Sequence, residues 1–199
     1  AIKHNLWVMS DEAYFEMRYS GTSKSIASLP GMLERTVILY TFSKKFAMTG
    51  WRLGAAIAPT ELANQIAKLN TNDESCTTHF VQYGGVEGVR GDQSSIPKML
   101  NTLKERRDIA VNMLNAMPGV SCHSPEAAFY LFPDVTEAME RKGIDDLAEF
   151  AEKALHATGV SFCTRRHFGR PQPGEQRNYV RFAFSGIDKQ EIQEGMDLF

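Results

Sequence analysis

The stretch TFSKKFAMTGWRLG, residues 41–54, directly continues the run RTVILYT at residues 35–41. Because that run is rich in β-branched and other apolar residues, it predicts a buried strand. Lys44 and Lys45 follow the end of this strand, and Arg52 comes eight positions after Lys44. Burying a bare ammonium costs several kcal/mol or lowers its pKa, so a lysine at this place needs a compensating partner.

The neighbours of the two lysines carry groups that suit an anion. Thr41 and Ser43 offer hydroxyls, and Arg52 offers a planar guanidinium that fits a phosphate. Gly50 and Gly54 permit close approach of the backbone. In the alternative interpretation both lysines extend from a loop into solvent, as most lysines do. The combination favours a lysine beside an anion site.

Residues 43–54, SKKFAMTGWRLG, resemble the lysine signature SKxFxMxGxRxG of the fold-type-I pyridoxal-phosphate aminotransferases of the aspartate aminotransferase class, and every fixed position matches. The resemblance implies that Lys44 is the catalytic residue. It would form the internal aldimine with pyridoxal 5'-phosphate and, once displaced by substrate, act as the base on the substrate's Cα proton. Thr41 and Arg52 would hold the cofactor's phosphate, and Lys45 would be a solvent-facing neighbour.

A second matching segment is VMSDEAYF at residues 8–15, where the family carries a similar DExY at the end of a strand. The resemblance implies that Asp11 pairs with the pyridine nitrogen of the cofactor and that Tyr14 bonds its phenolic oxygen. The alternative is an aspartate that caps a helix and a tyrosine that packs in the core. The presence of Lys44, 33 positions after Asp11 (44 minus 11), favours the cofactor interpretation.

A third matching segment is NYVRFAFSGI at residues 178–187. The resemblance implies that Arg181 binds the α-carboxylate of the substrate, and burying this arginine without an anion would be costly. The alternative is an edge strand on which Arg181 faces water. SPEAAFYLFP, residues 124–133, is similar to the family's GAFYxFP strand, except that Ala127 stands where a glycine is usual. Because alanine carries a Cβ that glycine lacks, this departure affects the backbone conformations open to the segment and the space left for substrate.

The order of elements predicts an α/β chain in two parts. Short apolar runs near turn residues indicate strands covered on both faces, and PTELANQIAKLN (59–70) indicates an amphipathic helix. The resemblance implies the PLP-transferase fold of type I: a partial, cofactor-binding large domain at residues 1–93 with a mainly parallel sheet, then a bridging helix and a smaller α+β domain at residues 94–199. The bridging helix begins near Ser95. The later elements expected are helices at Asp145–His156 and after Asp188, strands within VSCHS, AFYLFP, GVSFCT and NYVRFAFS, and a polar surface loop at RPQPGEQR (170–177).

Composition and charge exclude several classes of protein. The 199 residues are 43% hydrophobic and 23% charged, typical of a globular protein, and the formal net charge is −2 with a pI near 6.2. Scattered Lys and Arg residues favour neither nucleic acid nor a membrane as partner. Three cysteines without a C-x-x-C pair predict free, packed thiols in a reducing compartment, no metal site and a cytoplasmic protein. The apolar run near the N-terminus is too short for a signal peptide, so we expect none.

The function predicted is a pyridoxal-phosphate-dependent transfer of an amino group between an amino acid, with aspartate as default, and a 2-oxo acid. The segment NDESCTTHF, residues 72–80, holds no arginine for a second carboxylate, which weakens aspartate as the substrate. The resemblance covers only the later part of a family member, so we expect little turnover by this segment alone and a homodimer in the full-length form. The alternatives are a non-catalytic fragment, an effector-sensing aminotransferase-like domain of a regulator, or a related lyase or synthase.

Overall fold

The computed structural model describes residues 1–199, and the chain divides into two compact units, Ala1–Lys98 and Met99–Phe199. Helix α3, Ser95–Ala116, begins in the last residues of the first unit and continues into the second. The predicted α/β fold class is confirmed: the first unit combines helices with one mixed sheet, and the second combines helices with one small antiparallel sheet. No helix in the chain has the length and apolar character needed to cross a membrane.

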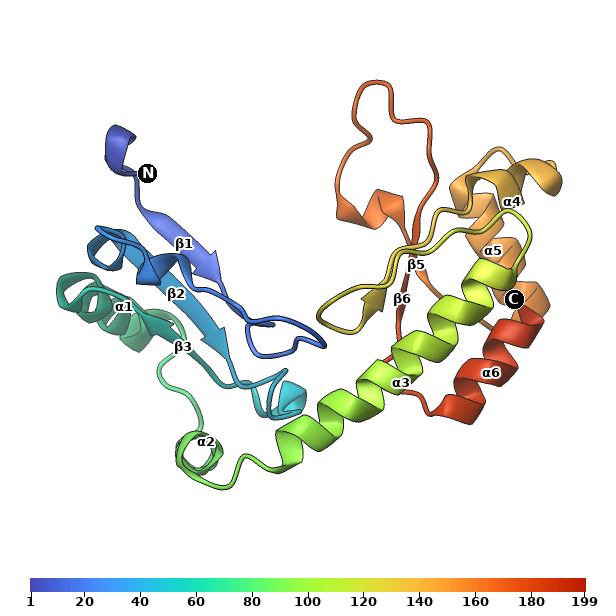
Figure 1. The fold of residues 1–199 in the computed structure, drawn as a ribbon. Helices are drawn as coiled ribbons and strands as arrows, with labels where there is room; N and C mark the ends of the chain where they lie inside the picture. Colours follow the sequence, from blue (N-terminus) through green and yellow to red (C-terminus); the bar gives the residue numbers. More distant parts are fainter. The chain divides into compact units, whose positions relative to one another are not determined.

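The first unit is built on a three-stranded sheet in the order β1-β2-β3, which Figure 1 shows in blue and teal. Strands β1 and β2 are parallel, with Asp11 opposite Leu39, whereas β2 and β3 are antiparallel, with Thr41 opposite Gly54. The sheet of this chain is therefore mixed rather than mainly parallel. Its elements are β1 (Val8–Asp11), β2 (Thr36–Thr41), β3 (Gly54–Ile57), α1 (Thr60–Asp73), α2 (His79–Arg90) and the 3₁₀ turns η1 (Ile2–His4), η2 (Ile26–Ser28), η3 (Leu33–Arg35) and η4 (Thr49–Trp51).

Burial in this sheet is uneven. Thr36 and Val37 of β2 are buried, but every residue of β3 is exposed and Met9 of β1 is 73% exposed. The prediction of strands covered on both faces is therefore wrong for β1 and β3 in this chain. The core cluster of the first unit lies instead beyond the end of β2, where Phe42, Met48, Leu53 and Val81 pack together.

The second unit contains an antiparallel sheet in the order β4-β6-β5, so β6 is the central strand. The segment VSCHS forms no strand, and only a single bridge joins Ser121 to Asp134. The elements of this unit are β4 (Tyr130–Leu131), α4 (Thr136–Arg141), α5 (Leu147–Thr158), β5 (Cys163–Thr164), η5 (Arg165–Phe168), β6 (Val180–Ala183) and α6 (Lys189–Leu198).

Side-chain caps set the boundaries of the last two helices. Asp146, one residue after the predicted start, accepts the amides of Ala148 and Glu149 and caps α5. Asp188 begins α6 as its N-cap, as the sequence predicted, and it forms a capping box with Glu191. The core of this unit consists of fully buried apolar side chains that include Leu114, Leu131, Val135, Met139, Val180, Phe184 and Ile192.

Candidate functional site

The predicted cofactor residues of the first unit gather at one edge of its sheet. Because β1 and β2 are parallel, their carboxyl ends lie at the same edge, and these ends are Asp11 and Thr41. Strand β3 runs antiparallel to β2 and starts at this edge with Gly54, two residues after Arg52. The strand directions alone therefore bring the carboxylate, the hydroxyl and the guanidinium to one side of the sheet.

The segment between β2 and β3 is held by packing as well as by hydrogen bonds. The amide of Phe42 donates to the carbonyl of Leu53 at 3.1 Å, which joins the two ends of the segment. Both residues belong to the buried cluster, with Met48 and Val81 of α2. A buried base of this kind fixes the backbone that carries Lys44, since Phe42 and Ser43 directly before it are buried.

Lys44 is half-buried and its ammonium lies 5.4 Å from the centre of the Tyr14 ring. A cation over an aromatic face at this distance is attracted by the ring. Tyr14 follows Asp11 by three residues, so this contact connects the segment after β2 with the segment after β1. The structure thus brings the Lys44 ammonium and the Tyr14 ring into contact.

Lys45 differs from its prediction. Its ammonium donates to Glu16 at 2.6 Å and lies 5.1 Å from the centre of the Phe46 ring, and its side chain is only 18% exposed. The expectation of a solvent-facing neighbour is therefore wrong, because Glu16 from the segment after β1 supplies a counter-charge. The same carboxylate acts on Tyr40: burial, then the charge of Glu16 and its hydrogen bond, raise the pKa of that phenol.

The remaining predicted residues of the first unit make local contacts. The Asp11 carboxylate accepts a hydrogen bond from the amide of Ala13 at 3.1 Å. The hydroxyl of Thr41 accepts a hydrogen bond from the amide of Ser43, also at 3.1 Å. Arg52 has a left-handed backbone, with φ 55°, and its guanidinium donates to the carbonyl of Thr49 at 3.1 Å. Asp11 ends a strand and caps no helix, so the helix-cap alternative is wrong.

A cavity of about 620 Å³ lies beside the end of β1. Asp11 and Tyr14 line it, together with residues of the segment that follows, among them Arg18 and Lys24. Acidic, phenolic and basic groups therefore share one hollow next to the predicted site. Thr41, Lys44 and Arg52 are not among the residues that line it.

Arg181 lies in the second unit, on the central strand β6. The edge-strand alternative is therefore wrong. Val180 and Phe182 on either side of it are buried, so Arg181 points to the other face of the sheet, where it is half-buried. Its guanidinium carbon lies 4.5 Å from the centre of the Tyr130 ring and 4.5 Å from the centre of the Phe168 ring.

Two aromatic residues beside Arg181 were missed by the sequence reasoning. Tyr130 belongs to a strand that the sequence predicted, but the contact depends on the pairing of β4 with β6. Phe168 follows a run of polar residues, and nothing in its spacing marks it. Ala127 stands at the usual glycine position, but its backbone is not left-handed. The left-handed residue of this segment is Ala128, with φ 61°.

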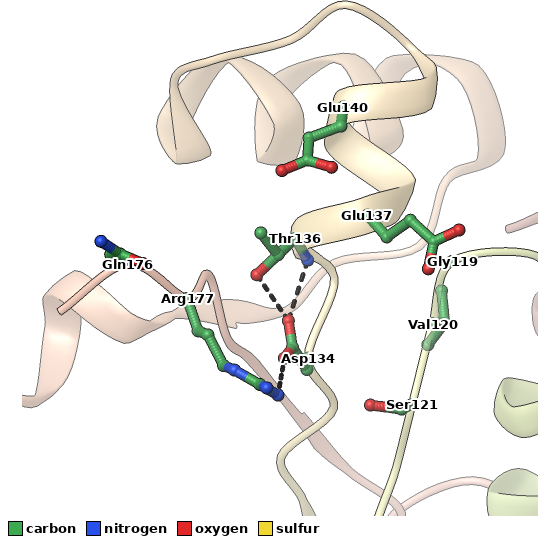
Figure 2. A pocket seen from close by; sticks show the side chains of 9 residues that line it. All are labelled: Gly119, Val120, Ser121, Asp134, Thr136, Glu137, Glu140, Gln176 and Arg177. Carbon is green, nitrogen blue, oxygen red and sulfur yellow. Dashed lines mark hydrogen bonds and ion pairs between the residues drawn. The ribbon is translucent and has the colours of Figure 1, made fainter.

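A second cavity, of about 650 Å³, lies wholly in the second unit and is shown in Figure 2. One of the residues that line it is Asp134, whose carboxylate accepts hydrogen bonds from the amide and the hydroxyl of Thr136 at 2.9 and 2.6 Å and from an N–H of Arg177 at 2.9 Å. These bonds hold the start of α4 to the segment before β6. The carboxylate therefore has a structural role in this cavity.

The three cysteines are all free thiols, but they differ in their surroundings. Cys122 is buried, as predicted for a packed thiol, whereas Cys76 is exposed, so the packing prediction is wrong for that residue. Cys163 is half-buried and lies 3.8 Å from a guanidinium nitrogen of Arg181.

Comparison with known proteins identifies the family. The family model for aminotransferase class I and II matches residues 1–199. The chain belongs to the class I and II aminotransferases. It is 35% identical to an aspartate aminotransferase of Musicola paradisiaca over 94% of this chain and 45% of that protein. It is also 35% identical to an asparagine–oxo-acid transaminase of Streptococcus mutans, over 86% of this chain and 44% of that protein.

A solved structure supports the same family. The crystal structure of an aromatic aminotransferase from Pyrococcus horikoshii is similar with a TM-score of 0.87 and 31% identity, over 98% of this chain and 50% of that one. The chain thus spans about half the length of the aminotransferases that it matches.

Proposed function

We propose that the intact protein is a pyridoxal-phosphate-dependent aminotransferase. It transfers the amino group of an amino acid to a 2-oxo acid. The amino acid becomes a new 2-oxo acid, and the 2-oxo acid becomes a new amino acid. The observation that carries the proposal is the convergence of Asp11, Thr41, Lys44 and Arg52 at one edge of the sheet, with Tyr14 beneath the Lys44 ammonium. Membership of the aminotransferase family supports it.

The chemistry of the donor set fits pyridoxal phosphate. Lys44 offers a primary amine for the aldehyde, Asp11 a carboxylate for the ring nitrogen, and Tyr14 a phenol for the ring oxygen. Thr41 and Arg52 offer a hydroxyl and a guanidinium for the phosphate. When bound, this cofactor supplies an electron-withdrawing ring that makes the Cα–H of an amino acid acidic.

The residues of this chain would supply the positioning and the proton transfer. The half-buried amine of Lys44 takes the proton from Cα of the substrate and is the only proposed base. The ring of Tyr14, below this amine, restricts where it can lie. The carboxylate of Asp11 keeps the bound ring nitrogen protonated, because a paired cation is favoured over a neutral base beside an anion.

Arg181 is proposed to bind the α-carboxylate of the substrate. A guanidinium holds a carboxylate with two parallel hydrogen bonds, which fixes orientation as well as affinity. The aromatic rings beside Arg181 leave it half-buried, where such a charge-assisted pair is stronger than in open water.

The substrate and the assembly remain part of the proposal. Relatives are named for aspartate, asparagine and aromatic amino acids, and we propose aspartate as the first amino acid to test, with 2-oxoglutarate as acceptor. We propose a homodimer for the full-length form and cytoplasmic activity. Light scattering with size-exclusion chromatography tests the assembly.

Trapping of the cofactor tests the catalytic lysine. The intact protein is mixed with pyridoxal 5'-phosphate, reduced with borohydride and mapped by mass spectrometry after proteolysis. We expect the pyridoxyl mass on Lys44 in the native protein and in the matched control Lys45→Ala, and its loss in Lys44→Ala. Labelling on Lys45, or none in the native protein, would contradict the proposal.

Transfer itself separates the enzyme from the alternatives. A panel of aspartate, asparagine and aromatic amino acids is incubated with 2-oxoglutarate, and both products are measured. Equal amounts of glutamate and of the new 2-oxo acid support an aminotransferase. Cofactor trapped on Lys44 without transfer to any acceptor would favour an effector-sensing or other non-catalytic protein, and unequal products would favour a lyase or synthase.

A further inference from the structure

The guanidinium of Arg181 contacts two aromatic rings from different elements. Tyr130 on β4 and Phe168 on η5 both have ring centres 4.5 Å from its central carbon. We call Tyr130 and Phe168 the aromatic clamp. All residues that form it belong to the unit Met99–Phe199.

Strand pairing explains why Tyr130 faces Arg181. In the antiparallel pair β4–β6, Tyr130 lies opposite Ala183. Side chains of paired residues point to the same face, and Arg181 shares that face with Ala183 because the two are two residues apart. Tyr130 is therefore a diagonal neighbour of Arg181. On the other side, Cys163 of β5 lies directly opposite Arg181.

Phe168 reaches Arg181 from a short turn that a network of polar contacts holds. The hydroxyl and amide of Thr164 contact Nδ1 of His167 at 3.0 and 3.1 Å, which closes the start of η5. Arg165 binds both carboxylate oxygens of Glu175, at 2.8 and 3.0 Å, and both side chains are less than 20% exposed. A bidentate pair of this kind is geometrically specific.

The Arg165–Glu175 pair also folds the following loop. Nη1 of Arg165 donates to the carbonyl of Gly169 at 3.2 Å, and Glu175 accepts the amide of Gln172 at 2.9 Å. The polar loop RPQPGEQR therefore does more than cover the surface, because it anchors the turn that ends in Phe168. Behind the ring, Phe132 contacts Phe168 edge-on with ring centres 6.0 Å apart.

We propose that the aromatic clamp, with the Arg165–Glu175 pair as its fastening, positions the Arg181 guanidinium for the α-carboxylate of the substrate. This inference rests on the proposed function, which makes Arg181 the carboxylate-binding residue. A guanidinium that lies over an aromatic ring can keep its in-plane N–H groups for hydrogen bonds to a carboxylate. Tyr130 and Phe168 are thus positioning residues, and Arg181 is the residue that contacts substrate.

Variants of Phe168 separate the aromatic face from simple packing. Phe168→Leu keeps apolar volume but removes the ring, and Phe168→Tyr keeps the ring. In the intact protein loaded with pyridoxal phosphate, we expect Phe168→Leu to raise KM for the amino acid about 3- to 10-fold with kcat changed less than about twofold. Phe168→Tyr should restore the native KM. A native KM in Phe168→Leu would overturn the positioning role of the clamp.

Two matched variants on the same turn test whether the Arg165–Glu175 ion pair holds the clamp in place. Arg165→Ala removes the pair with Glu175, whereas Arg166→Ala removes an ion pair with Asp146 that does not involve the clamp. We expect Arg165→Ala to raise KM like Phe168→Leu, and Arg166→Ala to keep the native value. Equal effects of the two variants would show that the loop acts only through general stability and would overturn the fastening.

A chemical readout makes the clamp testable apart from the reaction. Phenylglyoxal modifies exposed guanidinium groups, and the rate at Arg181 can be followed by mass spectrometry. We expect Phe168→Leu to raise this rate about threefold or more, because one stacked ring is lost, and Phe168→Tyr to keep it. An unchanged rate would overturn the clamp whatever the kinetics show.

Arg181→Ala separates failure of the clamp from failure of the proposed carboxylate-binding role of Arg181. If Arg181→Ala raises KM strongly while Phe168→Leu changes neither KM nor the labelling rate, the clamp fails and the function of Arg181 stands. In the second case, Arg181→Ala leaves KM unchanged while Phe168→Leu speeds labelling. The clamp then exists, but Arg181 does not bind the carboxylate of the substrate. This result would overturn both the proposed function of Arg181 and the positioning role of the clamp.

Discussion

Lys45 and Glu16 form an ion pair of 2.6 Å, although 29 positions separate them in the chain. The pair connects the segment after β2 with the segment after β1, the two segments that also carry Lys44 and Tyr14. The adjacent lysines thus differ in their partners: Lys45 has a carboxylate, and Lys44 lies over the ring of Tyr14. The signature distinguished the two lysines by role, but only the fold shows that Lys45 has a counter-charge.

Removing the ion pair should cost little stability. Glu16 is 39% exposed and Lys45 is 18% exposed, so solvent screens much of the attraction. We expect Glu16→Gln and Lys45→Ala each to lower the free energy of unfolding by less than about 1 kcal/mol. Urea denaturation of the intact protein measures this. A loss well above that value would show that the pair is needed for folding rather than for local order.

Gly119 should be far less tolerant of a side chain than Gly143. Both have a positive φ, 84° and 64°, so alanine at either position is strained. A Cβ at Gly119 would also lie 2.6 Å from the backbone nitrogen of Ala138, whereas a Cβ at Gly143 would meet nothing within 4 Å. The amide of Ala138 donates to the carbonyl of Gly119 at 3.1 Å, which prevents the two segments from moving apart cheaply.

We therefore expect Gly119→Ala to lower the free energy of unfolding by about 2–4 kcal/mol and Gly143→Ala by about 1–2 kcal/mol. The difference between them measures the backbone clash, because the strain from φ is shared. Thermal or urea denaturation of the two variants makes the comparison. Equal losses would contradict the close approach of Gly119 to the start of α4.

The sequence predicted the strand ends better than the contacts between them. The apolar runs before Asp11 and before Lys44 indicated two strands, and the signature fixed which residues follow them. The short run GAAI gave no sign of its direction, so the antiparallel pairing of β3 and the mixed sheet were not predicted. Exposure of β1 and β3 was missed because an apolar run indicates what a strand can bury and not what covers it.

The environment of Arg181 was predictable only in part. The alternation of Val180, Arg181 and Phe182 indicates that the arginine lies on the face opposite the buried residues. Phe168 could not be placed, since its contact depends on a 3₁₀ turn and on a bidentate pair between Arg165 and Glu175. Ion pairs between segments without regular periodicity leave no pattern in one sequence.

The three thiols should react at very different rates. Burial raises the pKa of Cys122 to about 11 from its ordinary value of 9.0, against a smaller opposing effect of a backbone hydrogen bond. At pH 8 this lowers its thiolate fraction about a hundredfold, and the thiolate is the reactive form. We expect iodoacetamide to label exposed Cys76 first and Cys122 only after unfolding. Mass spectrometry of the native protein reads the order, and early labelling of Cys122 would contradict its burial.

The Asp134 carboxylate should make stability depend on acid pH. Burial by itself would raise the pKa of this carboxyl, but the hydrogen bonds from Thr136 and Arg177 outweigh burial and hold the pKa below its ordinary value of 3.8 (Figure 2). A lowered pKa in the folded state means that the unfolded state binds a proton more readily. The stabilisation is therefore fully present above pH 4 or so and is lost as the pH falls through the folded-state pKa.

Comparison with Asp134→Asn isolates this effect. The amide keeps the shape but cannot ionise, so the free energy of unfolding of the variant should be lower than that of the native protein at pH 7, by about 1–3 kcal/mol. The gap should narrow below pH 4, because the native carboxylate becomes protonated while the amide does not change. Urea denaturation at pH 7, 5 and 3 measures the gap. A gap that stays constant over this range would show that Asp134 stabilises the start of α4 through its shape and not through its charge.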